Sequence, residues 1–133
     1  MSKRQVIHLP GVEHKAPIPA GVRIGNMVFS SAISGRDPAT GKYPDDPAEQ
    51  ARHAFANMAT VVRAAGGDVD DIAHVTVFLK DRDAKRFVDE QWLAMFPDEE
   101  DRPARHAVTL DRGGAMQVQL EIVAVLGQPE VVR

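Results

Sequence analysis

A chain of 133 residues is long enough for one domain with its own core, and its 44% hydrophobic and 26% charged residues are typical of a globular protein. The absence of cysteine excludes disulfides, thiolate metal sites and cysteine nucleophiles, and a net charge of -3 argues against a broad nucleic-acid-binding surface. No apolar stretch has the length of a signal peptide or membrane span, so we expect one cytoplasmic domain over residues 1–133, without membrane association.

The N-terminal half of the chain predicts short strands followed by a helix. Residues 5–9 alternate like a short strand, and residues 21–31 predict a β-hairpin because Gly25-Asn26 is a tight-turn signal between two apolar runs. Asp46 suits the cap of a helix, and apolar residues then recur at helical spacing as far as the glycines at 66–67. We therefore expect a strand, a hairpin and a long helix, in that order.

The C-terminal half predicts a buried strand, a second helix and a closing pair of strands. Residues 71–79 are nearly continuously apolar, as in a central strand, and residues 81–96 have a helical stripe that the next proline ends. Residues 104–110 and 117–125 both alternate like strands, and the glycines between them predict a turn. We expect these last two strands to pair as an antiparallel hairpin.

This order of elements favours an α+β fold with a sheet of about six strands and both helices on one face of it. The opposite face of the sheet then has no helix left to cover it. Because an apolar sheet face is normally buried, we expect another subunit to cover it and predict an oligomer.

Arg105 and Glu121 stand out on the two closing strands, where they would lie at the edges of one small sheet. The planar, permanently charged guanidinium of an arginine can bind a carboxylate through two parallel hydrogen bonds, and a nearby glutamate can orient water or move a proton. The alternative is an exposed ion pair on a hairpin, which is common and contributes little to stability. The residues alone leave both interpretations open.

A series of short motifs along residues 17–126 resembles the RidA/YjgF family. The motifs are GVRIGNMVFSS at 21–31, DPATG at 37–41, Gln50-Ala51 with Phe55 and Asn57, AAG at 64–66, Asp71-Ile72 leading to TVFLKD at 76–81, Phe96-Pro97, RPAR at 102–105, VQLE at 118–121 and Ala124-Val125. Their order and spacing extend over nearly the whole chain. The resemblance is therefore more specific than any single motif.

The resemblance implies a chorismate-mutase-like α+β fold with a mixed sheet, assembled as a homotrimer with active-site clefts between subunits and no cofactor. Members of the family hydrolyse reactive enamines and imines, such as those released by pyridoxal-phosphate enzymes, to a keto acid and ammonia. By resemblance, Arg105 binds the carboxylate of the substrate and Glu121 handles water or a proton. Ser30 lies where the family usually has a pocket serine or threonine.

Several pocket positions depart from the family pattern. Ile18 stands where many imine deaminases have a tyrosine, Ser31-Ala32-Ile33 stands where they have Ser-Gly-Gln, and Ala107 replaces a frequent cysteine. With Ser30, the side chains of Ile18, Ser31, Ile33 and Ala107 are the expected substrate-binding residues. The more apolar pocket favours a bulkier or catabolic substrate, and 2-aminomuconate, a dicarboxylate enamine, is the leading variant.

Other charged residues and histidines give weaker signals. His14, Lys15 and Arg23 would either bind a second carboxylate or be solvated in loops. His74 and His106 have no partner at metal-ligand spacing, so we expect no metal site.

Three functions remain open at this point. The first is a deaminase whose only partners are a small carboxylate substrate and further copies of the chain. The second is a trimeric protein that binds small carboxylates without turnover. The third, a ribonuclease or translation-inhibitor activity that the resemblance also implies, is disfavoured by the net charge of -3 and the aromatic content of 5%. Binding of carboxylates without turnover would separate the second function from the first.

Overall fold

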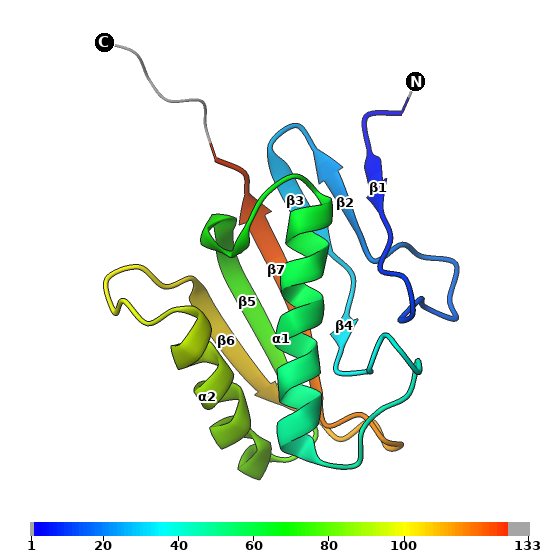
Figure 1. The fold of residues 1–133 in the computed structure, drawn as a ribbon, viewed down its shortest axis with the longest axis vertical. Coiled ribbons are helices and arrows are strands. Elements are labelled where there is room, and N and C mark those ends of the chain that lie inside the picture. The colour runs from blue at the N-terminus through cyan, green and yellow to red at the C-terminus, as the bar shows by residue number, and fades with distance from the viewer. Residues whose placement is uncertain (1, 128–133) are drawn as a thin grey trace.

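The computed structural model describes residues 2–127 as one sheet with two α-helices packed against it (Figure 1). The strands are β1 (Gln5–Ile7), β2 (Gly21–Ile24), β3 (Met27–Ser30), β4 (Ile33–Ser34), β5 (Ile72–Leu79), β6 (Ala104–Thr109) and β7 (Val118–Val125). The helices are α1 (Pro47–Ala64) and α2 (Lys85–Met95), with short 3-10 helices η1 (Val69–Asp71) and η2 (Arg82–Ala84). None of the helices in this part of the chain is long and apolar enough to cross a membrane.

The sheet is mixed, and both helices cover the same face of it (Figure 1). Its strand order is β1-β2-β3-β7-β5-β6, with β4 also paired to β7. β5 and β6 run parallel, and the other paired strands are antiparallel. The α+β class predicted from the sequence is therefore confirmed.

The core lies between the two helices and one face of the sheet. Val75 and Val77 of β5, Leu120 and Ile122 of β7, and Phe55 of α1 are each at most 1% exposed. Along both strands these buried side chains alternate with more exposed ones, because successive residues of a strand point to opposite faces. The other face of the sheet stays open in the single chain.

The predicted ends of α1 are confirmed by their capping contacts. The side chain of Asp46 accepts a hydrogen bond from the N–H of Ala48 at 3.0 Å, which satisfies a donor of the first turn. At the other end, Arg23 Nη1 donates to the carbonyl of Ala65 at 2.8 Å, and Gly66 follows with a φ of 95°. Arg23 thus stabilises the end of a helix, which explains its charge without a ligand.

The predicted hairpin between residues 104–110 and 117–125 is wrong. β6 instead pairs in parallel with β5, which lies between β6 and β7, so that Val75 faces Arg105 on one side and Ile122 on the other. The physical reason is that α2 crosses over between β5 and β6, which lets these two strands run in the same direction. The glycine-containing turn after β6 then carries the chain past the end of β5 to β7.

Two smaller differences concern short strands. The first strand ends at Ile7, earlier than the sequence predicts, and β4 is absent from the prediction because two residues are too few to show a period. β4 matters for the site, because it pairs with the start of β7 and places the turn that follows it beside that strand.

Candidate functional site

Arg105 lies on β6, the edge strand of the sheet, and its side chain is on the face that the helices cover. Its Nη2 donates to Asp89 Oδ1 of α2 at 2.8 Å, and its guanidinium carbon lies 4.9 Å from the centre of the Trp92 ring. The Arg105 side chain is 20% exposed. The guanidinium is therefore held between an acidic side chain and an aromatic ring, with part of it accessible.

Asp89 compensates part of the charge of Arg105. Lys85 Nζ donates to the second carboxylate oxygen of Asp89 at 2.9 Å, so the carboxylate has two cationic partners. Partial burial raises the pKa of Asp89, but the hydrogen bonds and charges of Lys85 and Arg105 outweigh it and leave the pKa below its ordinary value. Asp89 is thus ionised at neutral pH, and a ligand that binds Arg105 has to share the guanidinium with it.

Nη1 of Arg105 has no hydrogen-bond partner. Among residues 2–127 it is the one buried side-chain nitrogen or oxygen in this condition. A buried donor left unsatisfied costs about 1–3 kcal/mol, so such a group calls for an explanation. An acceptor that the single chain does not supply, such as a ligand carboxylate, would remove that cost.

Glu121 lies on β7, in the middle of the sheet, and its side chain is exposed. It is opposite Thr76 of β5, which in turn is opposite His106 of β6. Because residues directly opposite each other share a face, these three side chains form one row across the open face. Glu121 makes no ion pair within residues 2–127, so its carboxylate is available to water or a ligand.

Arg105 and Glu121 therefore lie on opposite faces of the sheet within one chain. Arg105 is in register with Val75 and Ile122, both buried under the helices, whereas Glu121 belongs to the row on the open face. The expectation that the two residues flank one small hairpin is wrong. A site that contains both side chains needs two copies of the chain.

Three of the predicted substrate-binding residues border one cavity. Ile18, Ser30 and Ser31 line a space of about 230 Å³ beside β2 and the end of β3. The hydroxyl oxygen of Ser30 accepts a hydrogen bond from the backbone N–H of Ile122 at 2.8 Å. Ser30 thus connects this cavity with the strand that carries Glu121.

The other two predicted substrate-binding residues lie elsewhere. Ala107 is exposed on β6, two residues after Arg105 and on the same face of the strand. Ile33 is 2% exposed, is in register with the buried Leu120, and belongs to the hydrophobic core. It borders neither the cavity at Ser30 nor a second, larger cavity beside β4, because the pairing of β4 turns its side chain towards the helices.

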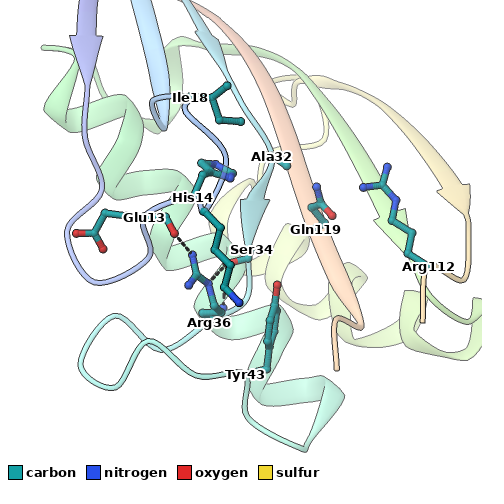
Figure 2. A pocket seen from close by; sticks show the side chains of 10 residues that line it. Glu13, His14, Ile18, Ala32, Ser34, Arg36, Tyr43, Arg112 and Gln119 are labelled. Carbon is teal, nitrogen blue, oxygen red and sulfur yellow. Dashed lines mark hydrogen bonds between the residues drawn. The ribbon is translucent and has the colours of Figure 1, made fainter. Parts of the chain in front are cut away.

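A larger cavity, of about 440 Å³, lies beside β4 and the start of β7 (Figure 2). Its polar lining includes His14, Lys15, Ser34, Arg36, Tyr43 and Gln119. The sequence singled out His14 and Lys15 as loop cations but gave no pattern for the others. Arg36 and Tyr43 lie in irregular segments, and the signal at Gln119 is its place in the motif at 118–121, as a polar residue within an apolar strand.

The histidines do not form a metal centre. His106 lies on the opposite face from Arg105, as strand alternation predicts, and His53 Nε2 lies 3.9 Å from Asp37 Oδ2. Within residues 2–127, no three histidine, aspartate or glutamate side chains gather closely enough to hold a metal ion.

Similarity to known proteins extends over most of the chain. The family model described as "Endoribonuclease L-PSP" matches residues 13–126. The 2-iminobutanoate/2-iminopropanoate deaminase of Escherichia coli (strain K12) is 36% identical over 111 residues, which cover 82% of this chain and 87% of the relative.

Solved structures agree with this similarity. The YjgF gene product of E. coli has a TM-score of 0.80 at 33% identity, over 91% of this chain and 98% of that chain. E. coli TdcF with bound serine has a TM-score of 0.82 at 31% identity, over 92% and 99% of the two chains. Because the family model spans most of the sequence and the fold agrees throughout, the chain belongs to the endoribonuclease L-PSP family, which is the RidA/YjgF family.

Proposed function

We propose that the chain is a deaminase that hydrolyses reactive enamine or imine acids to a keto acid and ammonia. The family, and a relative named as a deaminase of 2-imino acids, support this proposal. The observation that carries it is the state of Arg105, a guanidinium fixed against Trp92 with one nitrogen lacking an acceptor. A substrate carboxylate is the acceptor that fits this group best.

The reaction replaces nitrogen by oxygen and needs no cofactor. The oxygen of water bonds to the C=N carbon while the carboxylate of Glu121 accepts one proton of that water and passes it to the nitrogen. The remaining hydroxyl proton follows to the nitrogen as the C–N bond breaks, which leaves the keto acid and ammonia. An enamine first takes up a proton at carbon and loses one from nitrogen to become the imine. Positioning of substrate and water contributes most to the rate, because the substrate is already reactive.

Arg105 and Glu121 can act on one substrate only if two subunits supply them. The open face of the sheet carries four exposed apolar side chains, Ile24, Met27, Phe29 and Val125, which are 36–40% exposed and lie on neighbouring strands. Exposed apolar patches of this kind mark protein interfaces. We propose a homotrimer whose clefts combine Arg105 of one copy with Glu121 of the next.

The substrate types that we propose are 2-iminoalkanoates and 2-aminomuconate. Ile18 is 48% exposed, and Ala107 is exposed beside Arg105, so both can present apolar surface to a substrate. These side chains favour an acid with an apolar or extended chain over the smallest imino acids. The cytoplasmic location stays a prediction from the sequence.

The proposal is tested by ammonia release from freshly generated 2-iminopropionate and, separately, from 2-aminomuconate. We expect acceleration of at least one of them by the wild type, and a loss of about 100- to 10,000-fold in Arg105→Ala, since the charge-assisted hydrogen bonding of the substrate carboxylate is removed. Arg63→Ala is the matched control, because Arg63 pairs with Asp68 at the far end of α1. Equal activity of the two variants would show that Arg105 does not bind the substrate.

Glu121→Gln separates chemistry from binding. Removal of an acid–base group is expected to lower kcat by about 100- to 10,000-fold while carboxylate binding, measured by calorimetry, stays unchanged. If this variant keeps the full kcat, another group handles the proton and the assigned role of Glu121 is wrong.

The second candidate function is a trimer that binds small carboxylates without turnover. The apolar residues Ile18 and Ile33 favour it, because they stand where many imine deaminases have polar side chains. Carboxylate binding by a wild type that accelerates neither substrate would establish this function instead. Salt-sensitive RNA binding would be the corresponding sign of a ribonuclease.

A further inference from the structure

The larger cavity, beside β4 and the start of β7, contains a second arginine that the described part of the chain leaves without a paired carboxylate. Arg36 lies in its wall, and Figure 2 shows the side chains of Ser34, Tyr43 and Gln119 around the same space. Tyr43 and Gln119 make no side-chain hydrogen bond to another residue in the described part of the chain. Their polar groups are therefore available to a ligand in the cavity.

Arg36 is held by neutral oxygens alone. Its Nη2 donates to the backbone carbonyl of Glu13 at 2.8 Å and its Nε to the hydroxyl of Ser34 at 3.2 Å (Figure 2). No carboxylate within residues 2–127 forms an ion pair with it. The guanidinium is fixed in direction while its positive charge stays uncompensated, which is the condition for binding an anion.

The cavity is cationic although the chain is acidic. Lys15, Arg36 and Arg112 contribute three positive charges and Glu13 one negative charge, so the lining carries a net charge of +2, counted without histidine. The whole chain has a net charge of -3. Figure 2 shows the Glu13 carboxylate turned away from the Arg36 guanidinium. A concave surface of one sign, opposite to that of the whole molecule, attracts ligands of the other sign.

The backbone around Arg36 is fixed by buried contacts with α1. Asn57, which is 2% exposed, donates from Nδ2 to the carbonyls of Ser34 at 2.9 Å and of Arg36 at 3.0 Å. Gly35 lies so close to α1 that an added Cβ would overlap with the carbonyl oxygen of Gln50. The position of Arg36 is therefore set before any ligand binds, and little ordering cost is left for binding.

The cavity adjoins the proposed reaction centre. Gln119 precedes Glu121 by two residues on β7, so the two side chains project from the same face of that strand about 7 Å apart. Ile18 borders both this cavity and the smaller one that Ser30 and Ser31 line. A substrate of moderate length can thus extend from the reaction centre into the cavity at Arg36.

We propose that the cavity at Arg36 binds a second carboxylate, at the end of the substrate distant from the reacting C=N group, and so selects dicarboxylic imino or enamino acids. Arg36 provides the fixed charge, Lys15 and Arg112 add to the positive potential, and the hydroxyl of Tyr43 supplies a further donor. The inference rests on the proposed deaminase function for the identity of the substrate, but not for the binding of the anion.

The test compares a dicarboxylate with a monocarboxylate of the same chain length. The imines of glutamate and norvaline are generated in the assay by oxidases that accept these amino acids, and ammonia release is followed for the full-length wild type and for Arg36→Gln. We expect kcat/KM to fall by about 10- to 100-fold for the glutamate imine and to change less than about threefold for the norvaline imine. Arg82→Gln, an exposed arginine of η2 that does not line this cavity, is the charge-matched control and is expected to change neither value.

Binding without turnover is measured in parallel with 2-oxoglutarate and 2-oxopentanoate by calorimetry. Only the dicarboxylate is expected to lose affinity in Arg36→Gln, by a similar factor. Arg36 also joins two loops through its hydrogen bonds, so its replacement changes structure as well as charge. Lys15→Gln is therefore a second variant, because the side chain of Lys15 makes no hydrogen bond within residues 2–127. We expect it to lower dicarboxylate affinity about two- to fivefold without a change in melting temperature.

The outcomes separate the two proposals. If the wild type turns over both imines and Arg36→Gln lowers kcat/KM equally for both, the deaminase function stands and the second-carboxylate site is wrong. If no imine is turned over but the dicarboxylate still loses affinity in Arg36→Gln, the binding site stands and the deaminase function fails. Equal affinity of wild type and both variants for 2-oxoglutarate would overturn the inference.

Discussion

Two arginines of this protein, Arg105 and Arg36, are both held in place by the fold, but only the charge of Arg105 is partly compensated by a carboxylate. Arg105 on β6 is paired with the carboxylate of Asp89 and lies over Trp92, so part of its charge is already compensated. Arg36, beyond β4, donates to a carbonyl and a hydroxyl and pairs with no carboxylate in residues 2–127. Neutral acceptors fix the direction of a guanidinium without cancelling its field.

This difference separates two tasks that a substrate site can require. A partly compensated arginine holds a carboxylate by the geometry of its hydrogen bonds and releases it readily, which suits a group that binds every substrate and product. An uncompensated arginine in a concave site attracts anions more strongly and discriminates against ligands that lack one. Removing the contacts that support each arginine should therefore affect a different task.

The largest expected effect comes from removing the ring under Arg105. Trp92 is buried, packs edge-on against Phe96 at 4.9 Å between ring centres, and belongs to the core. Trp92→Ala should lower the free energy of unfolding by about 3–5 kcal/mol, measured by urea denaturation at fixed chain concentration. Leu93→Ala, next to it on α2 but 54% exposed, should cost less than about 1 kcal/mol. Equal losses in both variants would contradict the packing described for Trp92.

The corresponding support of Arg36 is Asn57. Asn57→Ala leaves two partly buried carbonyls without their donor and should lower the free energy of unfolding by about 1–3 kcal/mol. It should also reduce the preference for dicarboxylates while turnover that depends on Arg105 persists. Thr60→Ala is the control on the same helix, because the hydroxyl of Thr60 bonds only to the carbonyl of Ala56 within α1. An unchanged dicarboxylate preference in Asn57→Ala would show that Arg36 does not depend on this amide.

A smaller effect is expected when the carboxylate beside Arg105 is made neutral, so that Arg105, like Arg36, lacks a compensating charge. Asp89→Asn keeps an acceptor beside Arg105 but removes the compensating charge, so carboxylates should bind about two- to fivefold more tightly, as calorimetry would show. Glu90→Gln removes the same charge from the neighbouring residue of α2, which makes no ion pair within residues 2–127, and should have no effect. Weaker binding in Asp89→Asn would mean that the carboxylate positions Arg105 more than it competes with the ligand.

The smallest effect is the dependence of stability on pH through Asp89. Its pKa lies below the ordinary value of 3.8 in the folded chain, so its ion pairs stabilise the fold at neutral pH. That contribution is fully present above pH 3.8 and is lost as the pH falls through the folded pKa. The stability difference between wild type and Asp89→Asn, at most about 1 kcal/mol at pH 7, should therefore vanish in strong acid. A difference that grows on acidification would reverse the sign assigned to Asp89.

Local signals in the sequence predicted most elements of this fold. The turn at Gly25-Asn26, the cap at Asp46 and the apolar strand before α2 were each recognised because the residues that specify them are neighbours in the chain. Strand pairing depends on residues far apart in the chain, and the predicted pairing of the last two strands was wrong. The alternation in β6 and β7 indicates two strands but not which strand lies between them.

The sequence by itself thus determined the α+β class, the helices and the identity of Arg105 as a residue of interest, since these follow from short-range patterns and from residue type. Only the tertiary structure decided that Arg105 and Glu121 lie on opposite faces, because the insertion of β5 between their strands sets both registers. Only the tertiary structure gathers Lys15, Arg36 and Gln119 around one cavity. The charge of that cavity arises from segments with no local pattern in common, so packing alone reveals it.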